Sequence, residues 1–256
     1  VKQAIKDLRL DDKTFRPTGT LHAISNAKNN LILPEDFPIT SYRDEVAKRV
    51  YTRYQELLRA SNAVDFDDLL LETVRLLVDN PALREKYARR FEHVLVDEFQ
   101  DTNQVQYELL KLLASHHGNI FVVGDEDQSI YRWRGADYRN VLRFEEDYPS
   151  SRKILLEQNY RSTQTVLDAA RAVIDRNRFR TPKHLFSERG RGEKIVLYEA
   201  ADDRGEAAFV VDTVRQWVEG KRSSGGDFAI MYRTNAQSRL LEEAFLYAGL
   251  PYRLVG

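Results

Sequence analysis

The sequence has 256 residues, of which 42% are hydrophobic and 31% are charged, and its formal net charge at pH 7 is −1. This composition suits a soluble globular protein with one large or two modest domains, and the near-zero charge excludes a general electrostatic attraction to nucleic acid. The absence of cysteine excludes a disulfide framework and a cysteine-based metal site. No segment resembles a signal peptide or a membrane span, so the cytoplasm is the expected location.

The first 40 residues are polar, weakly periodic and interrupted by Pro17, Pro34 and Pro38. Apolar residues then recur at helical spacing, which predicts helices over 42–58 and 66–78 and a short one over 82–91. A β/α alternation follows. Its expected elements are strands 93–97, 119–124 and 153–157, and helices 103–116 and 138–147.

A second alternation occupies the rest of the chain. A helix over 163–177 leads into a basic connector at 181–192. The remaining expected elements are strands 194–199, 228–232 and 252–255, and helices 203–219 and 235–248. The two alternations together predict an α/β fold with two units.

The first chemical motif ends the strand at 93–97, where Asp97 and Glu98 follow an apolar run. Paired carboxylates at such a strand end form the Walker B arrangement, in which one holds Mg²⁺ and the other acts on the attacking water. Taken alone, a solvated acidic turn is the commoner explanation of this pattern.

The second motif is FVVGDEDQSIYRWRGA at 121–136. Gly124 lets the backbone turn at the strand end, and polar side chains up to Gln128 follow at the edge where open α/β sheets bind ligands. Tyr131, Arg132, Trp133 and Arg134 then offer flat faces for bases and cations for phosphates. The alternative is a loop whose tryptophan caps a core.

The third motif is KILLEQNYRST at 153–163. Tyr160 offers a stacking face and Arg161 a guanidinium fork for phosphate. An interdomain salt bridge with a half-buried tyrosine would explain the same residues. The basic stretch from Arg176 to Lys183 is interpreted as a solvated face in preference to a DNA contact.

These three blocks, in this order, resemble the UvrD/PcrA/Rep family of superfamily 1 DNA helicases, and the downstream segment 229–256 resembles the family's second motor domain. The resemblance implies two RecA-like units of the P-loop NTPase type, the first incomplete, with part of an inserted helical subdomain at the N-terminus. The implied domains are 1–42 (end of the helical subdomain), 43–158 (part of the first motor domain) and 159–256 (part of the second).

The resemblance also implies roles for individual residues. Asp97 would hold Mg²⁺ through water, Glu98 would activate the attacking water, and Gln128 would sense the γ-phosphate of ATP. Tyr160 would stack on adenine and Arg161 would serve as an arginine finger. The residues expected to bind single-stranded DNA are Tyr131, Trp133, Arg134, Arg233 and Asn235.

The implied activity is that of an ATP-dependent 3′–5′ DNA helicase acting on single strands and on single/double-strand junctions, with repair or replication proteins as partners. However, no G-x-x-x-x-G-K-[ST] phosphate loop occurs in the sequence. The chain alone is therefore expected to be inactive without the remainder of the helicase. Two alternatives stay open: the motor of a RecB/AddA-type helicase-nuclease, and a nonhydrolysing module that binds DNA or a partner.

Overall fold

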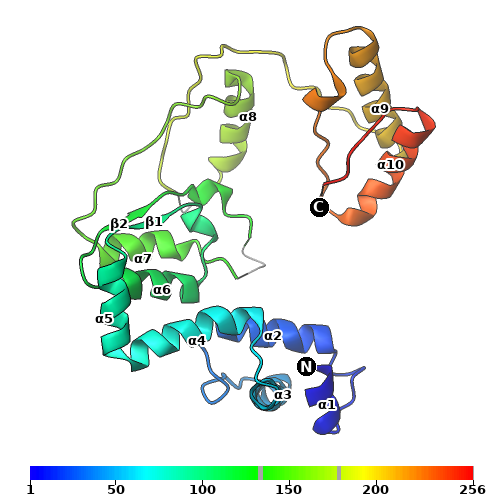
Figure 1. Ribbon diagram of the computed structural model, residues 1–256. Coiled ribbons are helices and arrows are strands. Elements are labelled where there is room, and N and C mark those ends of the chain that lie inside the picture. The colour runs from blue at the N-terminus through cyan, green and yellow to red at the C-terminus, as the bar shows by residue number, and fades with distance from the viewer. Residues whose placement is uncertain (132–134, 178–179, 256) are drawn as a thin grey trace. The chain divides into compact units, whose positions relative to one another are not determined.

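A computed structural model describes residues 1–131, 135–177 and 180–255 (Figure 1). The chain divides into two compact units. The first comprises Val1–Asn159 and Ala169–Phe186, and the second comprises Tyr160–Asp168 and Ser187–Gly256. None of the described helices is both long and apolar enough to cross a membrane.

The first unit begins with three helices that share one apolar core. They are α1 (Lys2–Asp7), α2 (Pro17–Asn29) and α3 (Tyr42–Ala60). Proline occupies the first turn of α2, and the Ser41 side chain caps α3 by accepting from the Asp44 N–H, as helix starts favour. The core of these helices contains Ala4, Ile5, Ile24, Ala27, Phe37, Val46, Ala47, Val50 and Tyr51.

Two further helices connect this bundle to the sheet. Helix α4 (Phe66–Asp79) starts at a capping box in which Asp65 and Asp68 each accept the other's backbone N–H, and α5 (Pro81–Arg90) starts with proline. Their apolar faces pack with α6 (Gln104–Ala114) around Val74, Leu77, Val105 and Leu112.

The sheet of the first unit has two parallel strands, β1 (Val94–Val96) and β2 (Ile120–Val122), paired Val94 to Ile120 and Val96 to Val122. Helix α6 connects them, and α7 (Arg139–Asp147) follows β2. Phe99, Tyr107 of α6 and Phe144 of α7 pack together under the strands. The parallel pair with its crossover helix confirms the predicted α/β class.

The second unit is built on α9 (Asp203–Glu219) and α10 (Ser238–Tyr247), whose shared core contains Val211, Val214 and Phe245. Short 3₁₀ turns lie at Gly225–Asp227 (η4) and Asn235–Gln237 (η5). Helix α8 (Gln164–Ile174) starts among residues of the second unit and ends among those of the first.

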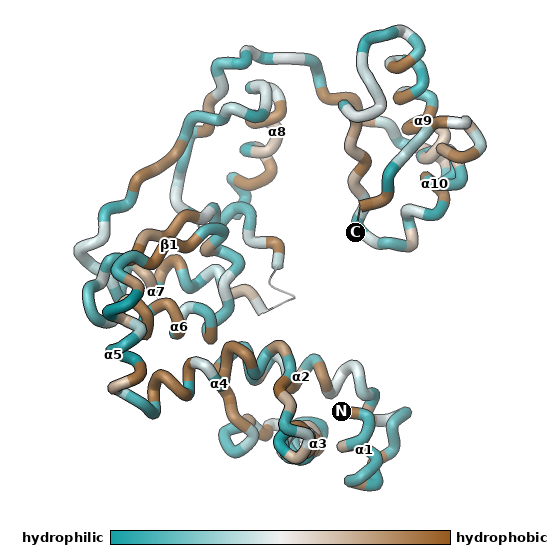
Figure 2. The backbone as a smooth tube through the Cα atoms, in the orientation of Figure 1, coloured by the Kyte–Doolittle hydropathy of each residue, from teal (hydrophilic) through white to brown (hydrophobic). Residues whose placement is uncertain are grey.

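Four predicted strands are not formed among the described residues: 153–157, 194–199, 228–232 and 252–255. Strand structure requires a hydrogen-bonded neighbour about 4.8 Å away. The described pairing near these segments is one isolated bridge, Gln158 to Phe186. Their apolar side chains are accordingly exposed, Leu197 by 94% and Met231 by 93%. Figure 2 shows hydrophobic stretches of tube before and after α8.

Candidate functional site

The end of β1 presents two adjacent carboxylates to solvent. Asp97 Oδ1 accepts the Glu98 N–H at 2.9 Å, and Glu98 adopts a left-handed conformation with φ 49° and ψ 43°. This turn starts the 3₁₀ helix η1 (Phe99–Asp101). It also sends the Asp97 and Glu98 side chains out at the carboxyl edge of the sheet, where parallel sheets place their ligands.

The end of β2 reaches the same edge of the sheet. Beyond the last strand pair, Val96 with Val122, the Phe99 N–H donates to Val123 O at 2.9 Å. Here Asp125 caps the 3₁₀ turn η2 (Glu126–Gln128) by accepting the Asp127 N–H at 3.0 Å. Gln128 Nε2 donates to Asp125 Oδ2 at 2.8 Å, so the proposed γ-phosphate sensor is held to its own loop.

Gln100 joins the two strand ends. Its Nε2 donates to Glu98 Oε2 at 2.8 Å, and its Oε1 accepts the Asp125 N–H at 2.9 Å. A Cβ atom on Gly124 would lie 2.7 Å from Gln100 Oε1, so this close approach requires glycine. Glu98, Gln100, Asp125 and Gln128 thus form one continuous hydrogen-bonded series.

Two cations from the segment after α8 pair with Asp125 and Asp127 of the acidic loop at 125–127. Arg180 donates to both carboxylate oxygens of Asp127, at 3.1 and 2.9 Å, and Lys183 Nζ pairs with Asp125 and, at 3.1 Å, with Asp127. Burial by itself would raise the pKa of Asp125, but the Lys183 and Gln128 hydrogen bonds lower it below its usual range. The interpretation of Arg180 and Lys183 as a solvated face is wrong, since both are largely buried ion-pair partners.

Buried amides fix the segment that follows η1. Asn103 Nδ2 donates to Asn29 Oδ1 of α2 at 2.7 Å, and Asn140 Nδ2 donates to Thr102 O at 3.0 Å. Asp101 lies between Glu98 and Thr102 in the sequence. Its Oδ1 is buried and has no hydrogen-bond partner among the described residues. Burial, followed by the nearby Glu98 carboxylate, raises the pKa of Asp101.

The predicted DNA-binding residues are found in three places. Tyr131 is exposed and continues the loop that carries Gln128, whereas Trp133 and Arg134 lie outside the described residues. Arg233 and Asn235 are exposed in the second unit. There Gln237 Oε1 accepts the backbone N–H groups of Arg233 and Thr234, which starts η5.

Tyr160 and Arg161 also belong to the second unit and are exposed. Arg189 Nη1 donates to the Arg161 carbonyl oxygen at 2.8 Å, which holds the backbone at this point while the Arg161 side chain reaches the surface. The structure therefore brings Asp97, Glu98 and Gln128 together within the first unit and places Tyr160 and Arg161 in the second.

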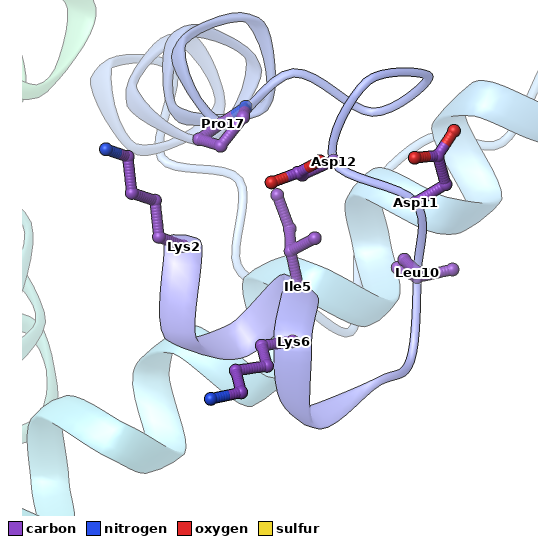
Figure 3. Close-up of a pocket in the computed structure, with 7 residues that line it drawn as sticks. All are labelled: Lys2, Ile5, Lys6, Leu10, Asp11, Asp12 and Pro17. Carbon is purple, nitrogen blue, oxygen red and sulfur yellow. The ribbon is translucent and has the colours of Figure 1, made fainter.

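The donor chemistry at the sheet edge fits a magnesium-nucleotide. Asp97 and Glu98 supply hard carboxylate oxygens, and Mg²⁺ is usually held by one or two carboxylates together with water and substrate phosphates. This edge is separate from a pocket of about 390 Å³ near the N-terminus (Figure 3). That pocket is lined by Lys2, Ile5, Lys6, Leu10, Asp11, Asp12 and Pro17.

Comparison with known proteins identifies the family of proteins to which the chain belongs. The UvrD/REP helicase N-terminal domain matches residues 1–149, and the UvrD-like helicase C-terminal domain matches residues 154–256. The chain therefore belongs to the UvrD/REP helicase family, and the resemblance inferred from the three sequence blocks is confirmed.

Individual relatives are similar over the whole chain. It is 47% identical over 259 aligned residues to the ATP-dependent DNA helicase PcrA of Leuconostoc citreum, covering 100% of the chain and 34% of the relative. It is 48% identical to the proteins of the same name from Staphylococcus aureus (strain NCTC 8325 / PS 47) and Bacillus subtilis (strain 168), covering 100% of the chain and 35% of each relative. The chain spans about a third of the length of these curated relatives.

Proposed function

We propose that this chain is part of an ATP-dependent DNA helicase that moves 3′ to 5′ along single-stranded DNA and separates duplexes in repair or replication. Residues 43–158 would belong to its first motor domain, 159–256 to its second, and 1–42 to the end of a helical subdomain. Family membership supports the class of enzyme. The observation that carries the proposal is the meeting of Glu98 and the Gln128 loop at one sheet edge through Gln100.

Glu98 would act on the attacking water. Its carboxylate would take a proton as the water oxygen bonds to the γ-phosphorus and the bond to the β–γ bridging oxygen breaks, releasing ADP. Asp97 would hold Mg²⁺, which when bound neutralises charge on the phosphate oxygens. Gln128 would contact the γ-phosphate, while Tyr160 would stack on adenine and Arg161 would stabilise the charge that develops during transfer.

One loop would couple the nucleotide to the strand. Gln128 and Tyr131 are three residues apart, and Trp133 and Arg134 follow in the sequence. Aromatic side chains stack on bases without strong sequence preference, as a protein that moves along DNA requires. Arg233 and Asn235 would contact the strand's backbone from the second motor domain.

Phosphate release by the full-length parent protein, with and without a single-stranded oligonucleotide, tests the proposal. We expect DNA to stimulate turnover into the range of typical enzymes, about 1–10³ s⁻¹. The 256-residue chain assayed alone should stay at background, because it lacks the lysine and hydroxyl of a phosphate loop. A full-length protein that binds the oligonucleotide but never hydrolyses ATP would support the nonhydrolysing module instead.

A further inference from the structure

Gln100 has the geometry of a link between two chemically different sites. The side chain is 1% exposed, and both ends of its amide are used. Nε2 donates to Glu98 Oε2 at 2.8 Å and Oε1 accepts the Asp125 N–H at 2.9 Å. Because the amide group is planar and buried, a displacement of one partner that carries the amide with it would change the geometry of the other bond.

The loop side of this link is also fixed. The Asp125 carboxylate accepts from Gln128 Nε2 at 2.8 Å and pairs with Lys183. Ser129 Oγ donates to the Gln100 backbone oxygen at 3.4 Å, which adds a second, longer contact between Gln100 and the loop. A shift of the loop at Asp125, to which Gln128 is bonded, would therefore reach the Gln100 amide.

At the other end of the link, the hydrogen bond from Gln100 sets the orientation of the Glu98 carboxylate. Glu98 is exposed and lies in a left-handed turn, so its side chain would otherwise have freedom to rotate. A hydrogen bond to a carboxylate is shorter and stronger than one between neutral groups, and it fixes the direction in which the carboxylate points. General-base catalysis requires that direction to match the attacking water.

We propose that Gln100 is a positioning residue that aligns the Glu98 carboxylate according to the position of the Asp125–Tyr131 loop, so that DNA held by the loop accelerates hydrolysis. The inference rests on the proposed function, because it assumes that Glu98 acts on water and that the loop binds DNA. Gln100 itself would contact neither nucleotide nor DNA. It acts through Glu98.

Two variants of the full-length protein separate the two bonds. Gln100→Met keeps the length of the side chain and removes both hydrogen bonds. Gln100→Glu keeps an acceptor for the Asp125 N–H but places a carboxylate against Glu98. Gln104→Met, at a half-buried position on α6, is the matched control for the loss of a glutamine amide.

We expect Gln100→Met to lower the DNA-stimulated kcat about 10- to 100-fold, by analogy with the loss of a group that orients a metal-binding side chain. KM for ATP should change less than about threefold, because Gln100 does not bind ATP, and the ratio of rates with and without DNA should fall. Hydrogen exchange at the Asp125 loop should speed up in Gln100→Met and stay near wild type in Gln100→Glu, although both lose turnover. Gln104→Met should match wild type throughout.

Wild-type kcat and DNA stimulation in Gln100→Met would overturn the inference and leave the proposed function standing. So would a rise in KM with unchanged kcat, since that pattern indicates lost ATP binding. If Gln100→Met does not fold, Gln100→Glu decides, and wild-type turnover in that variant would equally overturn the inference. A wild-type protein without DNA-stimulated hydrolysis would overturn both the inference and the proposed function.

Discussion

At the scale of single residues, Glu98 combines an unusual backbone with an exposed side chain. A non-glycine residue in the left-handed region costs about 1–3 kcal/mol and persists where the surrounding structure enforces it. The hydrogen bonds from the Phe99 N–H to Val123 O and from the Asp125 N–H to Gln100 Oε1 hold the two residues that follow Glu98. The strained turn leaves the carboxylate exposed at the sheet edge, where the proposed base would have to lie.

Glu98→Gln should therefore lower kcat of the full-length protein by roughly 10²-fold or more while ATP and DNA binding remain, because the amide keeps the shape but cannot take a proton. Steady-state phosphate release and nucleotide titrations measure both quantities. Glu92→Gln, an exposed position before β1, is the control and should leave kcat unchanged. Loss of ATP binding in Glu98→Gln would assign Glu98 a structural role instead.

At the scale of elements, a buried ion cluster joins α2 to α4. Lys28 is 0% exposed, and its Nζ lies 2.7 Å from both Asp65 Oδ2 and Asp68 Oδ1. Tyr54 OH of α3 donates to Asp65 at 2.9 Å, so three helices meet at this cluster. Asn29, which follows Lys28 in α2, accepts a hydrogen bond from Asn103 Nδ2. The cluster thus fixes the helix that supports the segment after η1.

Lys28→Met should destabilise these helices by about 3–5 kcal/mol, because it leaves two carboxylates near each other without their buried cation. Hydrogen exchange in peptides from α2, α3 and α4 of the full-length protein should speed up by a matching factor. Lys86→Met, at an exposed site on α5, is the control and should leave exchange unchanged. Unchanged exchange in Lys28→Met would contradict a stabilising role for the cluster.

The same cluster predicts a pH dependence. Burial by itself would raise the pKa of Asp65, yet the hydrogen bonds from Lys28 Nζ and its other donors hold this pKa below its usual range. A carboxyl whose pKa is lower in the folded state stabilises the fold above the unfolded value of about 3.9. Backbone amide hydrogen exchange in α2–α4, corrected for the pH dependence of the intrinsic exchange rates, should thus be constant from neutral pH to about pH 5. It should accelerate as the pH falls below about 4. Lys28→Met should lose this acid-dependent component.

Elements with local signals were predictable from the sequence. The helix periodicities at 42–58, 66–78 and 203–219 correspond to α3, α4 and α9, because apolar spacing and caps act within one segment. The four strand predictions at 153–157, 194–199, 228–232 and 252–255 were wrong for the described structure. An apolar run does not reveal which segment lies beside it, and a strand needs such a neighbour. Gln100 was missed, and Lys183 was assigned to a solvated face, for a similar reason. Their partner Asp125 lies 25 and 58 residues away, and neither a single glutamine nor a basic stretch reveals which distant residue it contacts.

At the scale of the whole molecule, the chain covers about a third of its curated relatives, while the candidate site already contains a complete hydrogen-bonded connection from Glu98 to the Gln128 loop. Tyr160, Arg161, Arg233 and Asn235 belong to the other unit. A motor of this kind would convert hydrolysis into movement only when both units act on the same nucleotide and strand. Movement and strand separation are therefore expected only of the full-length protein.

Strand displacement by the full-length protein tests whether it is a 3′–5′ helicase. The full-length protein is mixed with a short duplex that carries either a 3′ or a 5′ single-stranded tail, and release of a labelled strand is followed with ATP, without ATP, and with Glu98→Gln. We expect rapid ATP-dependent release from the 3′-tailed duplex, little from the 5′-tailed one, and almost none with Glu98→Gln. Release without ATP, preference for the 5′ tail, or full activity in Glu98→Gln would refute the proposed function.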